Sequence, residues 1–312
     1  MNALTHKKGL ALQMPPATPS PRAGTQAAAP AAAIPKSRRT LQPLLRRAAL
    51  VPAGLWLAWS VVALVLLWAV VPGWFSGHDP LVGLAGQQLR APASGHWLGT
   101  DALGRDVWAR VVHGSVHSLS GALVAVGVGL LGGTALGLLA GAAGGRLDDA
   151  LMRLVDVLLA VPSLLLSLTI IIVLGFGTVN AAIAVGVASV ASFARLVRSE
   201  VVRVRRTEYV EAAFGSGGRF GAVLWRHVLP NSLTSVVALA ALQFGTAILA
   251  IATLGFLGYG APPPTPEWGL LIAEGRNYLS TAWWLTTVPG LAVVAVVLAV
   301  NRISVALSGD PS

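Results

Sequence analysis

Few residues of this chain have the type and spacing that catalysis or metal binding needs. His113 and His117 are four residues apart, a separation that places two metal ligands on one face of a helix. No third ligand is evident near them, so a position at a membrane interface is the simpler interpretation of the pair. The chain has no cysteine, which excludes disulfides, thiolate metal sites and cysteine nucleophiles. We therefore expect neither a metal site nor a catalytic residue.

Motifs for ATP binding and for ion-driven transport are missing as well. The sequence contains neither the G-x-x-x-x-G-K-[ST] phosphate loop nor an H-E-x-x-H zinc motif. The long apolar runs carry no Asp, Glu or Lys at their centres, whereas proton- or sodium-driven transporters usually need ionisable groups or broken helices at mid-membrane. The six histidines lie outside these runs, which disfavours an intramembrane serine hydrolase.

The composition is that of a membrane protein. Hydrophobic residues make up 55% of the chain and charged residues only 11%, against about 25% charged residues in soluble domains. The net charge of +10 could indicate a nucleic-acid partner, but the basic residues cluster beside apolar runs. We therefore expect a lipid bilayer as the partner and no nucleic acid.

Six apolar runs approach or reach the length of about 20 residues that crosses a bilayer. Lys and Arg are concentrated before the first run and between the fourth and fifth runs, so an even number of runs separates the two basic segments. By the positive-inside rule, both basic segments and both termini are cytoplasmic. The sequence thus predicts an all-α integral membrane protein with six transmembrane helices, at 50–71, 119–143, 154–174, 180–197, 233–257 and 283–300.

These patterns divide the chain into five parts. Residues 1–48 are basic and proline-rich and cannot bury enough apolar surface to fold, so we expect a disordered cytoplasmic tail. A first transmembrane helix (49–72), a periplasmic or extracellular loop with a short helix (73–118), a five-helix core (119–305) and a C-terminal tail (306–312) follow. The second run spaces Gly129, Gly133 and Gly137 four residues apart, which predicts close helix packing.

A polar, basic loop at 203–231 separates the fourth run from the fifth. Residues 208–213 favour a helix, and the glycines at 215, 217 and 218 supply a turn because glycine reaches positive φ without penalty. A second helical piece extends from 219 towards Leu229, and Pro230 stops it. The loop is therefore predicted to form a short helix-turn-helix at the cytoplasmic face, where small alanine side chains let another protein approach.

This loop resembles the "EAA" coupling loop of ATP-binding-cassette (ABC) importer permeases. It pairs Glu211-Ala212-Ala213 with Gly217 and ends in Leu229-Pro230. Its turn, GSGGR at 215–219, is richer in glycine than the family pattern, which leaves open some detail of the contact with the ATPase subunit. Three further segments resemble the dipeptide/oligopeptide/nickel subfamily, and specifically its C-type subunit: HWLGTDALGRD at 96–106, LDDALMRLVDVLLAVP at 147–162 and GFLGYGAPPPTPEWG at 255–269.

The resemblance, which covers roughly 83–305, implies a type I ABC importer permease (MetI-like) fold in a bacterial inner membrane. It implies a B-type partner permease, one or two cytoplasmic ATPases that bind ATP and Mg, and an extracytoplasmic substrate-binding protein that contacts the 258–282 loop. No cofactor is expected on this chain. The implied cargo is a di- or oligopeptide, with nickel or another small solute as the alternative.

A membrane-embedded structural or enzymatic protein is the remaining class, and it is favoured only if the 203–231 loop is dispensable. The resemblance assigns no substrate-contacting residue. The residues it implies for the ATPase contact are Glu208, Tyr209, Glu211, Ala212, Ala213, Gly217, Arg226, Leu229 and Pro230.

Overall fold

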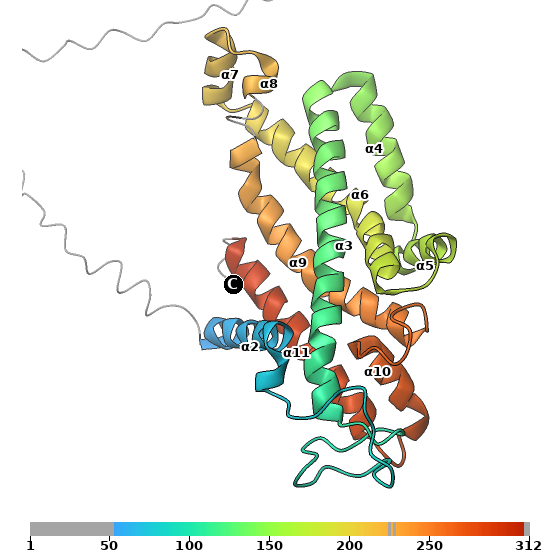
Figure 1. Cartoon of the computed structure of the whole chain (residues 1–312). Coiled ribbons are helices and arrows are strands. Elements are labelled where there is room, and N and C mark those ends of the chain that lie inside the picture. Colours follow the sequence, from blue (N-terminus) through green and yellow to red (C-terminus); the bar gives the residue numbers. More distant parts are fainter. Residues whose placement is uncertain (1–52, 224–225, 227–228, 309–312) are drawn as a thin grey trace, which may run out of the picture. The chain divides into compact units, whose positions relative to one another are not determined.

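A computed structural model of the protein describes residues 53–223, 226 and 229–308, without the side chains at 209, 211, 214, 220, 229 and 231–234. The predicted tail at 1–48 lies outside these residues. All regular structure in the described residues is helical (Figure 1), apart from two isolated bridges that pair Ala93 with His96 and Thr100 with Asp106. The predicted all-α class is therefore confirmed.

The helices in the described part of the chain follow one another in this order: α2 (Ala53–Val70), η1 (Pro72–Trp74), α3 (Val107–Ala143), α4 (Gly145–Ala160), α5 (Ser163–Leu174), α6 (Thr178–Arg205), α7 (Glu208–Gly215), α8 (Phe220–Val223), α9 (Leu229–Phe256), α10 (Trp268–Gly275), η3 (Arg276–Tyr278) and α11 (Trp284–Leu307). Five are long and apolar enough to cross a membrane: α2, α3, α6, residues 235–256 of α9, and α11. The bent pair α4 and α5 makes a sixth if it is counted as one span.

Helix α3 begins well before the apolar run that predicts it. Its first residue is Val107 rather than a residue near 119, because the Asp106 carboxylate accepts a hydrogen bond from the Ala109 amide (2.8 Å) and caps the helix there. Residues 107–118, expected in a loop, are thus the first turns of a 37-residue helix. At 1.5 Å per residue this helix is about 55 Å long.

The predicted third span is not one helix. The chain breaks after Ala160, and α4 and α5 meet at an angle of 95°. Pro162 accounts for the break, since a proline has no amide hydrogen and disfavours helical geometry in the residue before it. Asp148 anchors α4 to α6 by accepting two hydrogen bonds from Arg198, at 3.0 and 2.6 Å.

Helices α3 and α6 pack through the glycines that the sequence singled out. A Cβ atom on Gly133 would lie 2.3 Å from the Phe193 Cβ, and one on Gly137 would lie 2.6 Å from the Ala194 carbonyl oxygen. Such distances leave no room for a side chain, so the two helix backbones are in close contact here. The predicted close packing of this run is confirmed.

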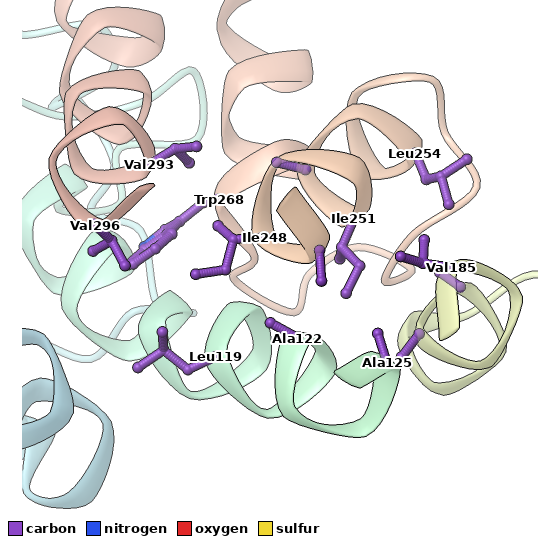
Figure 2. Packing of buried hydrophobic residues seen from close by; sticks show 14 of the residues in the cluster. Leu119, Ala122, Ala125, Val185, Ile248, Ile251, Leu254, Trp268, Val293 and Val296 are labelled. Atoms are coloured by element: carbon purple, nitrogen blue, oxygen red, sulfur yellow. The ribbon is translucent and has the colours of Figure 1, made fainter. Parts of the chain in front are cut away.

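The main core lies where α3, α6, α9, α10 and α11 meet (Figure 2). Trp268, at the start of α10, is fully buried there, and its indole Nε1 donates to the Val111 carbonyl oxygen of α3 at 2.9 Å. Gly114 of α3 faces this ring, and a Cβ there would lie 3.2 Å from it. The short helix α10 is therefore held against the first turns of α3.

Two polar regions lie at opposite ends of α3. The loop assembly, which we define as residues 71–106 with 257–283, adjoins the first turns of this helix. At its last turn, the Arg205 guanidinium donates from Nη1 to the carbonyl oxygens of Gly141 and Ala142, at 2.7 and 2.8 Å. Because Arg205 ends α6, the 203–231 segment begins at that end of α3 (Figure 1).

Candidate functional site

The 203–231 segment contains a helix-turn-helix, as predicted, but its second helix differs from the prediction. Pro230, expected to stop that helix, lies in the first turn of α9, where a proline is tolerated. Helix α7 covers Glu208–Gly215, a turn follows, and α8 covers Phe220–Val223. The turn closes on α7, since the Ser216 amide donates to Ala212 (2.9 Å) and the Gly218 amide donates to Ala213 (3.1 Å).

Two of the three turn glycines are required by geometry. Gly217 has φ of +85°, a backbone conformation that residues with a side chain rarely adopt. A Cβ on Gly218 would lie 2.6 Å from the Ala213 carbonyl oxygen and 2.8 Å from a methyl of Val223. Gly215 has open space around it and no such constraint.

A small apolar cluster holds the two short helices in place. Val210 of α7 is fully buried, and Val223 of α8 is 3% exposed. They pack with valines from the end of α6 and the start of α9, and half-buried Ala213 packs against the same group; the buried members are Val197, Val201, Val204, Val210, Val223 and Val236. One face of the helix-turn-helix is thus anchored while the other stays open.

The predicted coupling residues divide accordingly. Glu208, Ala212, Gly217, Arg226 and Pro230 are exposed. Ala213 is half-buried. The backbones of the remaining three fall in helices, in α7 for Tyr209 and Glu211 and in α9 for Leu229, while their side chains lie outside the described residues. The role of this set stays a prediction.

A polar hollow lies between α3, α5, α6 and α9, within the candidate spans. Its volume is about 210 Å³, and Ala125, Val126, Val185, Ala188, Ala247 and Ala250 form its apolar walls. Its polar lining consists of hydroxyl and amide groups and carries no charged residue: Ser163, Ser189, Ser192, Gln243 and Thr246. Sequence patterns missed this set because its members lie on three separate helices, and no local pattern shows that these helices meet. The break at Pro162 brings Ser163, the first residue of α5, into the lining.

Between the loop assembly and the first turn of α3, four charged side chains form a largely buried ionic cluster. Arg110 is 1% exposed and donates from Nη1 to Asp101 (2.6 Å) and Glu274 (2.7 Å). Arg105 donates from Nε to Asp101 at 2.6 Å and lies 3.4 Å from Glu274. Burial alone would raise the pKa of Asp101, but hydrogen bonds from Arg105 and Arg110 and their positive charges together lower it.

Buried Glu267 ties α10 to α3. Its carboxylate accepts hydrogen bonds from the amides of Gly269 (2.9 Å) and Leu270 (3.0 Å), which caps α10, and from the Ser118 hydroxyl of α3 (3.3 Å). Burial raises the pKa of Glu267 despite these hydrogen bonds. The loop assembly is therefore rich in buried polar contacts.

Residues 133–309 match the protein-family profile described as "binding-protein-dependent transport system inner membrane component". The chain belongs to this family. The matched residues of this inner membrane component include the 203–231 segment and most of the polar hollow, whereas residues 71–106 of the loop assembly precede them.

Curated relatives resemble most of this inner membrane component. The Dipeptide transport system permease protein DppC of Alkalihalophilus pseudofirmus is 43% identical over 69% of this chain and 71% of that protein. The Probable D,D-dipeptide transport system permease protein DdpC of Escherichia coli is 39% identical over 77% of this chain and 81% of that protein. The Glutathione transport system permease protein GsiD of Pectobacterium atrosepticum is 41% identical over 67% and 70% of the two chains.

The fold also matches a solved structure. One chain in a crystal structure of inward-facing conformations of the MetNI methionine ABC transporter aligns with a TM-score of 0.50 and 19% sequence identity, covering 64% of this chain and 96% of that chain. This likeness confirms the predicted MetI-like fold, whereas the sides on which the termini lie stay a prediction.

Proposed function

We propose that this inner membrane component is the permease subunit of an ATP-driven importer of di- or oligopeptides. The observation that carries the proposal is its sustained identity, about 40% over two thirds or more of the chain, with proteins named as dipeptide, D,D-dipeptide and glutathione permeases. These relatives are transport subunits, and the chain is accordingly a transport component rather than an enzyme.

The polar hollow is our candidate for the surface that meets the cargo. Peptides differ in side chains but share backbone amides and carbonyls, which hydroxyl and carboxamide groups hydrogen-bond equally well. A lining without charged residues favours no particular peptide charge, and its small apolar walls allow passage without tight binding. These features suit a pathway that accepts many peptides.

The 203–231 segment is our candidate for the ATPase contact. A segment that couples the ATPase to the transmembrane helices needs one face packed against those helices and another face open to the ATPase. The valine cluster supplies the first, and exposed Glu208, Ala212, Gly217 and Arg226 supply the second. ATP and Mg would bind to the separate ATPase subunits, whose closure would shift the helices between inward-open and outward-open states.

The same proposal implies the remaining partners and the orientation. Excess positive charge at 1–48 and 195–231 favours a cytoplasmic position for both segments and for the termini. The loop assembly then faces the outside of a bacterial inner membrane, where the 258–282 loop would contact the substrate-binding protein. A B-type permease would complete the pathway.

Copurification tests the assembly. Complexes extracted from native membranes in mild detergent should contain a second permease and one or two P-loop ATPases, identified by mass. Recovery of this chain alone, even after crosslinking through Glu211, would contradict the coupling proposal.

Uptake by the reconstituted complex tests the cargo. Proteoliposomes with ATP inside should accumulate labelled dipeptide and not Ni²⁺, and uptake of Ni²⁺ alone would reject the peptide assignment. Thr246→Val removes a hydroxyl from the hollow and should lower maximal peptide uptake several-fold. Thr253→Val is the matched control, because both hydroxyls lie on α9 and donate to a carbonyl of their own helix, but Thr253 lies outside the hollow. Equal effects would remove the hollow from the pathway.

A further inference from the structure

Three side chains able to bind a metal converge in the loop assembly although they are far apart in sequence. His78 follows η1, His96 lies in the bridge with Ala93, and Asp106 caps α3. One donor atom from each lies within 4.8 Å of the other two. Asp106 is buried, His96 is 14% exposed and His78 is exposed.

The contacts of His96 leave a place for a cation. Its Nε2 lies 2.6 Å from the side-chain oxygen of Gln87, an acceptor that requires a proton on that nitrogen. Its Nδ1 lies 2.9 Å from Oδ1 of Asp106. In a neutral ring this nitrogen carries a lone pair, which would face a carboxylate oxygen directly. A proton between the two atoms, or a metal ion bound to both, removes the repulsion.

Two of the donors are held rigidly. The second carboxylate oxygen of Asp106 accepts the Ala109 amide at 2.8 Å, which fixes the orientation of the group. The backbone of His96 exchanges two hydrogen bonds with Ala93, both 3.1 Å long. The Gln87 contact resembles the outer-shell acceptors that orient metal-binding histidines in proteins. His78, exposed and beside the His96 ring at 5.1 Å between centroids, is the donor that can turn inward.

We propose that His78, His96 and Asp106 bind a resident first-row divalent ion of the Zn²⁺ or Ni²⁺ class. An N–O separation of 2.9 Å lets both atoms lie about 2.1 Å from one ion with an angle near 90°. Two imidazoles and a carboxylate are ligands that such ions accept. A hollow of about 210 Å³ beside His78 and Asp106, walled by Phe75, Trp97 and Trp108, has room for water to complete the coordination.

The ion would join three segments of the chain. It would tie the chain after η1 and the bridge at 93–96 to the first turn of α3. The site is therefore structural, and its role is to hold the loop assembly in one conformation. It does not depend on which cargo the permease carries.

Metal binding to the complete chain in lipid nanodiscs tests the site. The protein is purified through a tag without histidine, stripped with EDTA, and titrated separately with Zn²⁺ and with Ni²⁺ by calorimetry. Bound metal per chain is counted by mass spectrometry after desalting. Wild-type protein should bind one ion, and its thermal midpoint should rise as the ion is added, since a ligand that binds only the folded state stabilises it.

Asp106→Asn is the decisive variant, because asparagine still caps a helix but removes the ligand charge. It should keep the metal-free thermal midpoint and lose at least tenfold in affinity, as should His96→Ala. Gln87→Ala should weaken binding roughly tenfold or more through ring orientation. His113→Ala is the control, since the His113 ring lies 2.9 Å from the Ala109 carbonyl oxygen and has no part in the cluster. No binding by wild type, or equal binding by wild type and Asp106→Asn, would overturn the proposal and leave a simple imidazolium–carboxylate pair.

Discussion

The two ends of α3 are built in different ways. At its last turn, the 203–231 segment is attached mainly by small apolar side chains, and most of its turn is open to solvent. At its first turns, the loop assembly is attached by buried charges and capped helix ends, such as Arg110 with Asp101 and Glu267 with α10. Apolar contacts are non-directional, whereas buried polar contacts demand one geometry. The comparison indicates that the 203–231 segment can adjust to a partner, whereas the loop assembly is rigid. We refer to the loop assembly in this role as the brace.

The two ends of α3 should also differ in the substitutions that they tolerate. Repacking among valines changes the free energy gradually, because contact energy follows the area buried. Removing one charge from a buried cluster leaves its partner without compensation, which is far more destabilising. Substitutions at the two ends should therefore differ in kind: loss of stability at the brace and loss of coupling at the segment.

The largest effect is expected from Arg110→Met. The change keeps much of the side-chain volume but leaves Asp101 and Glu274 with only Arg105 to balance them. Breaking such a buried arrangement destabilises by about 3 kcal/mol or more, which corresponds to a fall of roughly 10 °C in the thermal unfolding midpoint. The midpoint measured in mild detergent checks the prediction.

Arg195→Met is the matched control for this measurement. Arg195 is 57% exposed and its partner Asp156 is 61% exposed, so their ion pair is screened by solvent. Exposed pairs contribute about 1 kcal/mol at most, and the midpoint should hardly move. Equal losses in the two variants would mean that the loop assembly is not a brace.

Gly217→Asp should separate coupling from stability at the other end. A Cβ on Gly217 meets no atom within 4 Å, and Asp is among the residues that best tolerate its positive φ, so the fold should survive with a strain of about 1 kcal/mol and a small fall in thermal midpoint. A carboxylate in the proposed ATPase contact should lower ATP-driven peptide uptake at least tenfold, equivalent to about 1.4 kcal/mol.

The control for backbone strain is Gly145→Asp. Gly145 also has positive φ (+58°) and open space, but it starts α4 and lies outside the 203–231 segment. Its variant should transport normally. Normal uptake by Gly217→Asp, or the same loss in both variants, would contradict the coupling role.

The comparison also shows what could be predicted from the sequence. Residues close in sequence determine the apolar runs, the regularly spaced glycines of α3 and the helix-turn-helix at 208–223. Local preference can therefore predict them. The predicted third span was wrong as a single helix, although Pro162 stands in the sequence as the signal. The early start of α3 depends on one cap, Asp106, within a region of mixed polarity.

The polar sites could not be predicted in the same way. The hollow gathers one or two polar residues from each of three helices, and the cluster of His78, His96 and Asp106 joins three segments that are far apart in sequence. His113 and His117 have the regular spacing of a metal-binding pair, but neither belongs to this cluster. Tertiary contacts decide such sites, and no local pattern reports them.

The smallest effect expected is local, at the turn between α7 and α8. Gly218→Ala places a methyl against the Ala213 carbonyl oxygen and Val223, which should loosen the turn by about 1 kcal/mol. Cleavage of an exposed site follows the population of the opened form, so trypsin should cut after Arg219 roughly fivefold faster, as followed by fragment mass.

Gly215→Ala offers the matched comparison, three residues away at a site with open space and no positive φ. Alanine there suits the end of α7 and should leave cleavage unchanged or slower. If both variants are cut at the wild-type rate, Gly218 does not hold the turn, and the valine cluster alone determines its geometry. If cleavage is faster only in Gly218→Ala, close backbone packing adds a fixed point to the segment that otherwise contrasts with the brace.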